Sequence, residues 1–324
     1  MYSLDELSAL TEESVAKLKF PAEPALLYEP VKYTLEAGGK RLRPMLALAS
    51  CAVFNDNPEA AADVAMAIET FHNFTLLHDD IMDNADKRRG RETVHVKWNE
   101  NVAILSGDAM VIYAYKLISR NDPAKLPALI NVFNEFALGV CEGQQYDMNF
   151  ETSLDVSVDE YMNMIRLKTA VMIAGSAQMG AITGGASEEN AARMYDFGIA
   201  LGLGFQLQDD LLDTYGDPAI FGKNIGGDIM CNKKTFLLIK ALELAEGVTK
   251  KKLLDLLSAE NPVREEKISA VREIYDATGV RELAHRAVDK YFSQAENILA
   301  SVNAPANRKT GVMEILNYLK DRNK

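Results

Sequence analysis

At residues 76–83 the chain reads Leu-Leu-His-Asp-Asp-Ile-Met-Asp, at the end of an apolar run with helical spacing. The stretch recurs in altered form at residues 205–213 as Phe-Gln-Leu-Gln-Asp-Asp-Leu-Leu-Asp. In a helix, the first and third carboxylates of each Asp-Asp-x-x-Asp triplet are four residues apart and the second and third are three apart, so all three share one face. Like charges placed in this way destabilise a helix by about 0.2–0.5 kcal/mol per pair. A chain that does this twice is expected to hold a counter-ion at both places.

The expected counter-ion is Mg²⁺. Carboxylate oxygens are hard ligands, and Mg²⁺ binds through a few of them together with water and phosphate oxygens. Both acidic triplets follow strongly apolar runs, at residues 71–77 and 199–207, which a solvated acidic helix face would not do. The glycine and the terminal glutamate of a calcium-binding loop are missing. The pattern therefore favours a metal site over a solvated face.

Length and charge limit the classes of protein that the chain can represent. Its 324 residues, 48% of them hydrophobic, are enough for a large core. We expect one domain over residues 1–324, because the two acidic triplets lie in different halves of the chain and make sense only if the fold brings them together. The net charge of −12 argues against nucleic acid as a partner. An anionic substrate must then be held by local basic residues.

The chain is expected to be cytoplasmic. Its three cysteines are Cys51, Cys141 and Cys231, and their wide spacing fits neither a metal site nor a redox motif, as is typical of a reducing compartment. The first twenty residues mix acidic and apolar positions and resemble neither a signal peptide nor an anchor. We expect no apolar run long enough to cross a bilayer.

Apolar positions recur at intervals of three and four, and sustained alternation is nearly absent, so the sequence predicts an all-α fold of about ten helices or more. Pro44 is expected in the first turn of a helix. Clusters of Asn, Gly, Pro and Ser predict where helices end. These breaks are expected at residues 55–58, 121–127, 152–157, 184–187, 215–227, 261–262 and 303–308.

Basic residues are few but concentrated. Residues 38–44, Gly-Gly-Lys-Arg-Leu-Arg-Pro, join a turn to a helix N-terminus, where N–H groups and cationic side chains can meet an anion. Residues 87–91, Lys-Arg-Arg-Gly-Arg, come directly after the first acidic triplet, and Lys233 and Lys234 follow the second. A plain charge-balancing loop or a solvated first turn stays open for each stretch. Acid followed by base at both places indicates a metal-bridged diphosphate.

These motifs, in this order, resemble the trans-isoprenyl diphosphate synthases, also called polyprenyl synthetases. The resemblance runs from about Gly38 to the C-terminus, and includes Gly-Gln-x-x-Asp at residues 143–147 and Gly-Lys at 222–223. It implies an all-helical fold around a central catalytic cavity, and usually a homodimer. It also implies head-to-tail condensation of isopentenyl diphosphate with an allylic diphosphate (dimethylallyl, geranyl or farnesyl). The reaction would use Mg²⁺, about three ions per active site, with Mn²⁺ as a substitute.

The resemblance also implies a role for each matching residue. The metal ligands would be aspartates of the two triplets, principally Asp79, Asp83 and Asp209, with Asp80, Asp210 and Asp213 as further or supporting candidates. Isopentenyl diphosphate would be held by Lys40, Arg43, His72 and Arg89. The allylic substrate would be held by Arg88, Lys168, Thr169, Gln206, Lys223 and Lys233, of which Lys168, Thr169 and Gln206 would also act in catalysis.

The residue types suit this chemistry. Ionisation of an allylic diphosphate leaves a carbocation and a highly charged leaving group, which Mg²⁺, Lys and Arg stabilise. The departed diphosphate can take the final proton, so no side-chain base is obligatory. This agrees with a chain that has four histidines and no triad-like arrangement.

In this family, residues just before the first acidic triplet border the tunnel that receives the growing product, and a large side chain forms its floor. Here these residues are Phe74 and Thr75, with Phe71 one turn deeper. Phe74 without an insertion between the aspartates resembles geranylgeranyl diphosphate synthases. We therefore expect a C20 product, with C15 as the next choice; simple core packing of Phe74 is the alternative.

Four other functions stay open at this point. A longer-chain synthase would be expected to carry a small residue at position 74, and a terpene cyclase usually has a different second metal motif. A regulatory subunit of a heteromeric synthase would have lost aspartates that this chain keeps. A protein that only binds Mg²⁺ would bind diphosphate without turnover.

Overall fold

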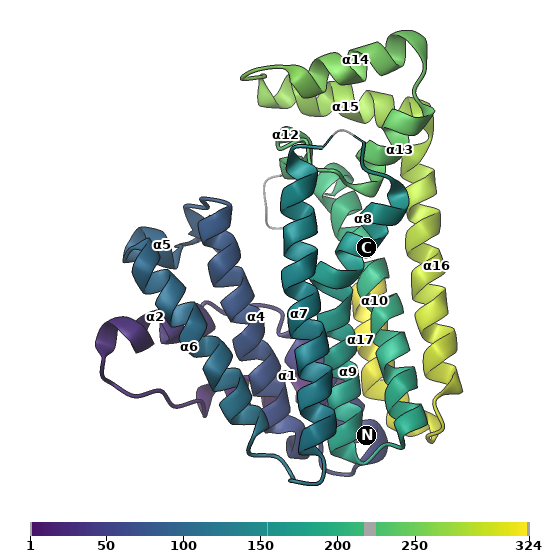
Figure 1. Cartoon of the computed structure of the whole chain (residues 1–324). Coiled ribbons are helices and arrows are strands. Elements are labelled where there is room, and N and C mark those ends of the chain that lie inside the picture. The colour runs from purple at the N-terminus through teal and green to yellow at the C-terminus, as the bar shows by residue number, and fades with distance from the viewer. Residues whose placement is uncertain (1, 154, 217–224, 323–324) are drawn as a thin grey trace. The chain divides into compact units, whose positions relative to one another are not determined.

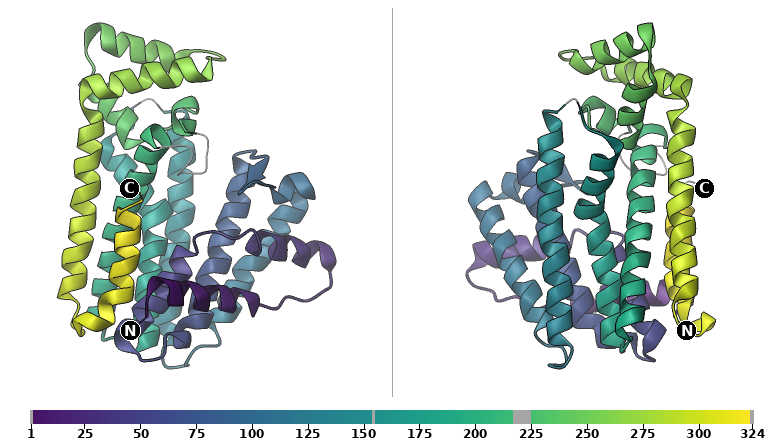
Figure 2. Two further views of the ribbon diagram at one scale, coloured as in Figure 1. Left: turned by 180° about the vertical axis from the view of Figure 1, so that it is seen from behind. Right: turned by 45° about the vertical axis from the view of Figure 1, so that its right-hand side comes forward.

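The computed structural model describes residues 2–153, 155–216 and 225–322. Most of this is helix (Figures 1 and 2). The only strands in the described part are two pieces of two residues each. The predicted all-α fold is confirmed. The chain forms two compact units.

The first unit comprises Met1–Glu135, Gly175–Tyr195 and Leu299–Ile315. The elements that lie wholly within it are α1 (Leu4–Ala16), α2 (Ala25–Leu35), α3 (Leu42–Phe54), η1 (Pro58–Ala61), α4 (Ala62–Met82), β1 (Lys87–Arg88), β2 (Arg91–Glu92), α5 (Val94–Lys97), α6 (Glu100–Ile118) and η3 (Ala306–Lys309).

The second unit comprises Phe136–Ala174, Asp196–Ile298 and Leu316–Lys324. The elements wholly within it are α8 (Val158–Ile165), the π-helical turn η2 (Arg166–Ala170), α12 (Gly227–Met230), α13 (Phe236–Leu244), α14 (Gly247–Ser258) and α15 (Arg264–Thr278). Five helices have residues in both units: α7 (Leu126–Glu151), α9 (Val171–Gly184), α10 (Glu188–Tyr215), α16 (Val280–Ser301) and α17 (Thr310–Lys320). In Figures 1 and 2, α14 and α15 lie side by side as a helical hairpin.

Helix α3 carries the predicted first-turn proline, because Pro44 is its third residue and needs no backbone N–H there. The helix is almost entirely buried. Residues of α9 cross it closely: a Cβ added at Gly180 would lie 2.1 Å from the Ala47 carbonyl oxygen, and one at Gly184 would lie 2.7 Å from that of Cys51. The glycines therefore allow two backbones to touch.

The predicted helix breaks are confirmed within the described residues. Helices α3, α6, α7, α9, α14 and α16 each end at or next to one of the expected Asn, Gly, Pro or Ser clusters. The break after α10 includes residues 217–224, which lie outside the described residues. The three cysteine thiols are unpaired, with Cys51 buried and the other two exposed, as their spacing predicted.

The expectation that no apolar run is long enough to cross a bilayer needs correction for α6. Helix α6 is long and apolar enough to cross a membrane by length and composition alone, and no other helix in the described ranges is. Its inner face belongs to the core of the first unit, because Ala103, Met110 and Ala114 are fully buried and α6 lies along α4 (Figure 1). The run of apolar residues is explained by this packing together with an exposed apolar face on the other side.

Candidate active site

The first acidic triplet occupies the end of α4. Asp83 is the C-terminal cap, and its backbone N–H donates to the Asp79 carbonyl oxygen at 2.8 Å. Three carboxylates here meet the negative end of the helix dipole, and the last turn holds no basic residue of its own. Asp80 is buried and accepts from Arg88 Nε at 2.7 Å. Burial nevertheless raises the pKa of Asp80 above its usual value, although the Arg88 guanidinium acts to lower it. The helix end is therefore a strong candidate to attract further cations.

A hairpin that the sequence did not predict brings Arg88 back to Asp80. Strands β1 and β2 pair in antiparallel register, and the turn between them is Arg89-Gly90. Both turn residues have positive φ, 52° and 76°, the combination that closes a two-residue hairpin. Beyond the turn, the Arg91 guanidinium lies 3.9 Å from the centre of the Tyr33 ring. The Arg-Arg-Gly-Arg sequence thus turns two arginines toward the site and a third onto an aromatic face.

The turn before α3 receives Arg89. Gly38 and Gly39 have φ of 72° and 137°, and the Arg89 guanidinium donates to the Gly38 carbonyl oxygen. A Cβ added at Gly39 would lie 2.8 Å from the guanidinium carbon, so a larger residue there would displace the Arg89 side chain. Lys40 follows on the exposed side of this turn.

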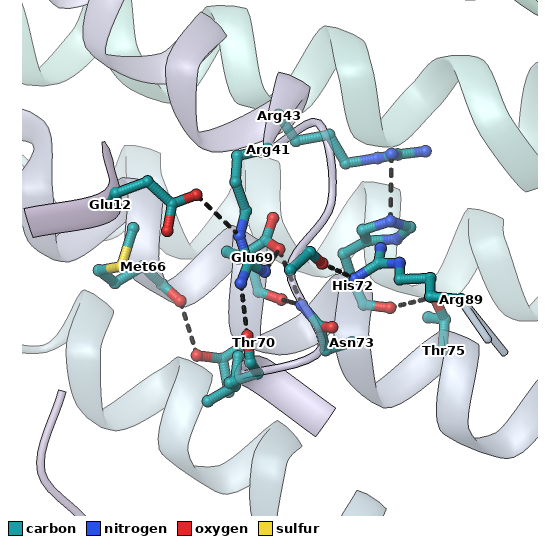
Figure 3. Close-up of polar contacts among 12 residues, drawn as sticks. Glu12, Arg41, Arg43, Met66, Glu69, Thr70, His72, Asn73, Thr75 and Arg89 are labelled. Carbon is teal, nitrogen blue, oxygen red and sulfur yellow. Dashed lines mark hydrogen bonds and ion pairs between the residues drawn. The ribbon is translucent and has the colours of Figure 1, made fainter. Parts of the chain in front are cut away.

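Arg41 anchors the same turn to the interior of the first unit. Its side chain is buried, pairs with buried Glu69 and donates to the Leu35 carbonyl oxygen, as Figure 3 shows in part. The Arg41 backbone is left-handed, with φ of 45°, directly before the first residue of α3. This arginine is therefore part of the scaffold. Its neighbours have other surroundings: Lys40 is exposed, and Arg43 lies next to His72.

Arg43 and His72 meet in Figure 3, with Nη1 of the guanidinium 3.3 Å from Nε2 of the ring. The guanidinium donates, so the ring nitrogen accepts and His72 is neutral. Burial, followed by Arg43 and Arg89, holds the pKa of His72 well below its usual value. Burial lowers the pKa of Arg43 to about 10. Positive charge has therefore gathered around a neutral histidine.

Two buried nitrogens in this cluster, Arg43 Nε and His72 Nδ1, have no hydrogen-bond partner among the residues that the structure describes. Unpaired buried polar atoms cost about 1–3 kcal/mol each. An anionic ligand would satisfy such donors. The cluster of Arg43, His72 and Arg89 therefore fits a diphosphate, and three of the four residues predicted to hold isopentenyl diphosphate lie together here.

The second acidic triplet lies on α10. Asp210 is buried and accepts from the Tyr161 hydroxyl and, at 3.0 Å, from Gln206 Nε2. Burial and the nearby Asp228 raise the pKa of Asp210 to about 7. Asp209 lies 3.3 Å from the Arg322 guanidinium, and Asp213 accepts from the Asp228 backbone N–H at 2.9 Å. Asp210 therefore faces the protein interior and organises its neighbours.

Lys168 and Thr169 lie in the π-helical turn η2 between α8 and α9. Such turns are rare and frequently occur at functional sites. Lys168 Nζ pairs with the Asp147 carboxylate at 2.6 Å, and the Thr169 hydroxyl donates to Gln206 Oε1 at 3.0 Å. A Cβ added at Gly143 would lie 2.3 Å from the Lys168 backbone nitrogen. The Gly-Gln-x-x-Asp motif thus lets α7 approach the π turn and supplies the carboxylate that holds the lysine.

The segment after α12 adds Lys233, whose ammonium lies 3.8 Å from the Asp228 carboxylate. Burial raises the pKa of Asp228 to about 6, against the effect of Lys233. Burial would lower the pKa of Lys233, but Asp228 and the neighbouring carboxylates together raise it above its usual value. Lys267 of α15, also buried, donates to Asn232 Oδ1 at 2.7 Å and so holds this segment. Predicted residue Lys223 lies outside the described residues.

Sequence reasoning missed Asp147, Tyr161 and Asp228 as members of the site. Asp147 ends the Gly-Gln-x-x-Asp motif and Asp228 is five residues before Lys233, so a carboxylate close to a predicted cationic residue was a usable signal. Tyr161 is spaced three and four residues from Met164 and Ile165, as in the apolar stripe of a helix, and no local pattern distinguishes its hydroxyl from that of a core tyrosine.

The three predicted floor residues lie close together on α4. Thr75, four residues before Asp79, shares the Asp79 face, and its hydroxyl donates to the His72 carbonyl oxygen. Phe71 lies four residues before Thr75 and three before Phe74, so it adjoins both, and the Phe71 and Phe74 ring centres are 5.3 Å from each other. Phe71 is buried and also contacts Phe133, at 5.2 Å between ring centres. Their role as the product floor stays a prediction.

No three His, Cys, Asp or Glu side chains of the described residues form a ready-made metal cluster. The exposed or partly buried carboxylates of Asp79, Asp83, Asp209 and Asp213 are nevertheless the donor type that Mg²⁺ uses together with water and substrate phosphate oxygens. The donor set therefore fits this ion.

Comparison with known proteins agrees with this chemistry. The family model for polyprenyl synthetase matches residues 24–276. The chain belongs to the polyprenyl synthetase family. It is 39% identical to a short chain isoprenyl diphosphate synthase of Methanothermobacter thermautotrophicus over 297 residues, which cover 91% of this chain and 90% of the relative. It is 35% identical to a geranylgeranyl diphosphate synthase of Methanosarcina mazei, covering 99% and 98%.

Structural comparison leads to the same family. A crystal structure of a geranylgeranyl pyrophosphate synthase superposes with a TM-score of 0.95 at 43% identity, over 100% of both chains. Geranylfarnesyl diphosphate synthases are among the further sequence relatives. The family predicted from the sequence is confirmed, as are the isoprenoid synthase fold and the assignment as a prenyltransferase.

Proposed function

We propose that this polyprenyl synthetase joins isopentenyl diphosphate head-to-tail to allylic diphosphates, with Mg²⁺, and releases a short-chain all-trans prenyl diphosphate and diphosphate. The observation that carries the proposal is the cluster of Arg43, His72 and Arg89, with two unsatisfied buried nitrogens. His72 lies on the same helix as Asp79, and Asp83 caps that helix. A diphosphate site next to a carboxylate pair is what the reaction needs.

Isopentenyl diphosphate would be held by Lys40, Arg43, His72 and Arg89. The two arginines bring guanidinium groups whose planar N–H donors suit phosphate oxygens. Arg89 is directed by the positive-φ turn and by its bond to Gly38, and Arg43 by the first turn of α3. His72 stays neutral and can donate from Nδ1 while Nε2 accepts from Arg43.

The principal metal ligands would be Asp79, Asp83 and Asp209, with Asp213 as a further candidate. Asp80 and Asp210 would act as supporting residues, since each is buried and already accepts hydrogen bonds from the protein. When bound, Mg²⁺ would neutralise charge on the leaving diphosphate. Arg88, Lys168, Lys223 and Lys233 would supply the remaining positive charge.

Thr169 and Gln206 would act next to the allylic carbon. The Thr169 hydroxyl donates to the Gln206 amide oxygen, and the amide nitrogen donates to Asp210, so both side chains have fixed orientations. Fixed dipoles stabilise a developing carbocation without reorganising during the reaction. No side-chain base is required, because the departed diphosphate can accept the final proton.

We propose a C20 product. Support comes from the large ring of Phe74, five residues before Asp79, and from the relatives named as geranylgeranyl diphosphate synthases. A growing chain that follows the Asp79 face of α4 toward its N-terminus would meet Thr75 first and then Phe71. The Phe74 ring centre is 5.3 Å from that of Phe71.

We also propose a homodimer in the cytoplasm. Helix α6 exposes Ile104, Leu105 and Ile112, by 43%, 60% and 67%, on the side away from its buried residues. An apolar stripe of this kind on a helix is typical of a subunit interface. Three unpaired thiols agree with a reducing compartment.

The test is to incubate the purified protein with isopentenyl diphosphate, Mg²⁺ and, in turn, C5, C10 and C15 allylic diphosphates, and to size the products by mass spectrometry. We expect a C20 end point and diphosphate release. D79A and D209A should each lower the rate by about 10²- to 10³-fold, as for loss of a group that stabilises transition-state charge. Binding without diphosphate release, with every primer, would contradict the proposal. Products of C30 or longer would contradict only the assignment of Phe74 as the floor of the product tunnel.

A further inference from the structure

The His78 ring occupies a notch in α6. A Cβ added at Gly107 would lie 2.3 Å from His78 Nε2, so the imidazole lies where any other residue would place its side chain. Nε2 is 3.2 Å from the Ile104 carbonyl oxygen, and since a carbonyl only accepts, the ring N–H donates. Gly107 is buried, and α6 runs along α4. The ring is therefore fixed by shape and by one hydrogen bond.

The other side of the His78 ring contacts Phe74. The two ring centres are 4.7 Å apart, with an interplanar angle of 66°. Phe74 is also in contact with Phe71, which in turn meets Phe133 of α7. Phe71, Phe74 and His78 are three and four residues apart, so they share one face of α4. Phe74 is thereby enclosed between a fixed phenylalanine and a fixed histidine.

We propose that His78 is a positioning residue that sets product length by holding the Phe74 ring in place. The inference rests on the proposed function and on Phe74 as the floor. Phe74 is only partly buried and packs against the buried core that includes Ala103 and Met110 of α6. Contacts with His78 and with Phe71 further restrict the rotamers that its ring can adopt. The notch at Gly107 is what allows the histidine to do this.

The first test compares H78A, F74A and the double variant, with total isopentenyl incorporation and product length measured separately. H78A should lengthen the main product by one or more C5 units while total incorporation stays within about threefold of wild type. F74A should lengthen it at least as much. In the F74A background, H78A should add no further lengthening, because it acts through a ring that is no longer there.

The outcomes separate the levels of the argument. No condensation by the wild type would overturn the proposed function itself. Unchanged length in F74A would overturn the floor and the inference with it. Unchanged length in H78A, with a longer product in F74A, would overturn the inference alone, as would lengthening by H78A that adds to that of F74A.

Gly107 offers a second test that leaves both rings in the chain. G107A adds one methyl group where the imidazole now lies, so His78 must leave the notch and the product distribution should shift away from that of the wild type. The matched control is S106A, at the adjacent buried position, whose hydroxyl donates to the Leu27 carbonyl oxygen at 3.1 Å instead of facing His78. S106A should keep the wild-type product length. Equal product lengths for G107A, S106A and wild type would contradict the role of the notch.

Discussion

The buried Tyr161 hydroxyl donates a hydrogen bond to the Asp210 carboxylate, which also accepts from Gln206. Because Gln206 in turn accepts from Thr169, the tyrosine of α8 is connected through two side chains to the π turn. The second aspartate of the second triplet is thus the centre of a hydrogen-bonded chain. Its carboxylate orients the groups that we place next to the allylic carbon.

The variant Y161F removes the hydroxyl and keeps the ring. The Asp210 carboxylate then loses a donor in a buried place, so the free energy of unfolding should fall by about 1–3 kcal/mol. Gln206 loses its fixed orientation, and kcat should fall by about tenfold, equivalent to roughly 1.4 kcal/mol. Urea denaturation and steady-state kinetics measure the two effects.

The control for this variant is Y115F, which removes a hydroxyl that donates to exposed Asn134 at 2.6 Å in the other unit. Its kcat should equal that of the wild type. If Y161F also kept the full kcat, the hydrogen-bonded chain would have only a structural role.

A second prediction concerns the ion pair of Lys168 and Asp147. D147N keeps the shape of the side chain but removes the charge that fixes the ammonium group. We expect the KM for the allylic substrate to change and kcat/KM to fall by about tenfold, because Lys168 no longer has a fixed position next to the diphosphate. E296Q is the matched control, since Glu296 forms a 2.7 Å pair with Lys320. Equal losses in the two variants would show that the effect is not specific to the π turn.

Helix ends and the two acidic faces could be predicted because they depend on local rules. Spacing of three and four places Asp79 with Asp83, and Asn, Gly, Pro and Ser clusters mark where backbone hydrogen bonding stops. The basic residues beside each triplet are read directly from the sequence. Membership in the family followed from the order of these motifs.

Features that depend on packing between distant segments could not be predicted. Tyr161 and Asp210 are 49 positions apart, and only tertiary structure directs the hydroxyl to the carboxylate. The π turn requires Gly143 on another helix, and the notch for His78 requires Gly107 on α6. The direction of the Phe74 ring likewise depends on its contacts with other rings. Sequence spacing places each residue on a helix face but does not say what that face meets.

His72 provides a prediction about pH. Burial and the arginines around it lower its pKa in the folded protein, so below pH 6.5 the unfolded chain binds a proton that the folded protein does not. Stability should therefore fall as the pH drops from 6.5 to 5.5, by up to about 1.4 kcal/mol from this residue. H72Q removes the titrating group. Its stability should fall less than that of the wild type over this interval, and parallel curves from urea denaturation would contradict the assignment.

The buried pair of Arg41 and Glu69 gives the last prediction. Removing one partner leaves the other charged and buried, so R41M should lower the free energy of unfolding by about 3–5 kcal/mol. By contrast, Arg120 and Asp63 form a pair whose side chains are 53% and 41% exposed, and R120M should change stability by less than about 1 kcal/mol.

Arg41 also donates to the Leu35 carbonyl oxygen and precedes α3 in a left-handed conformation, so its loss should loosen the turn that carries Lys40 and Arg43. The KM for isopentenyl diphosphate should therefore rise in R41M, measured at a temperature where the variant is folded, while R120M keeps the wild-type value. A stable R41M with unchanged KM would show that the turn is held by its glycines and Arg89 alone.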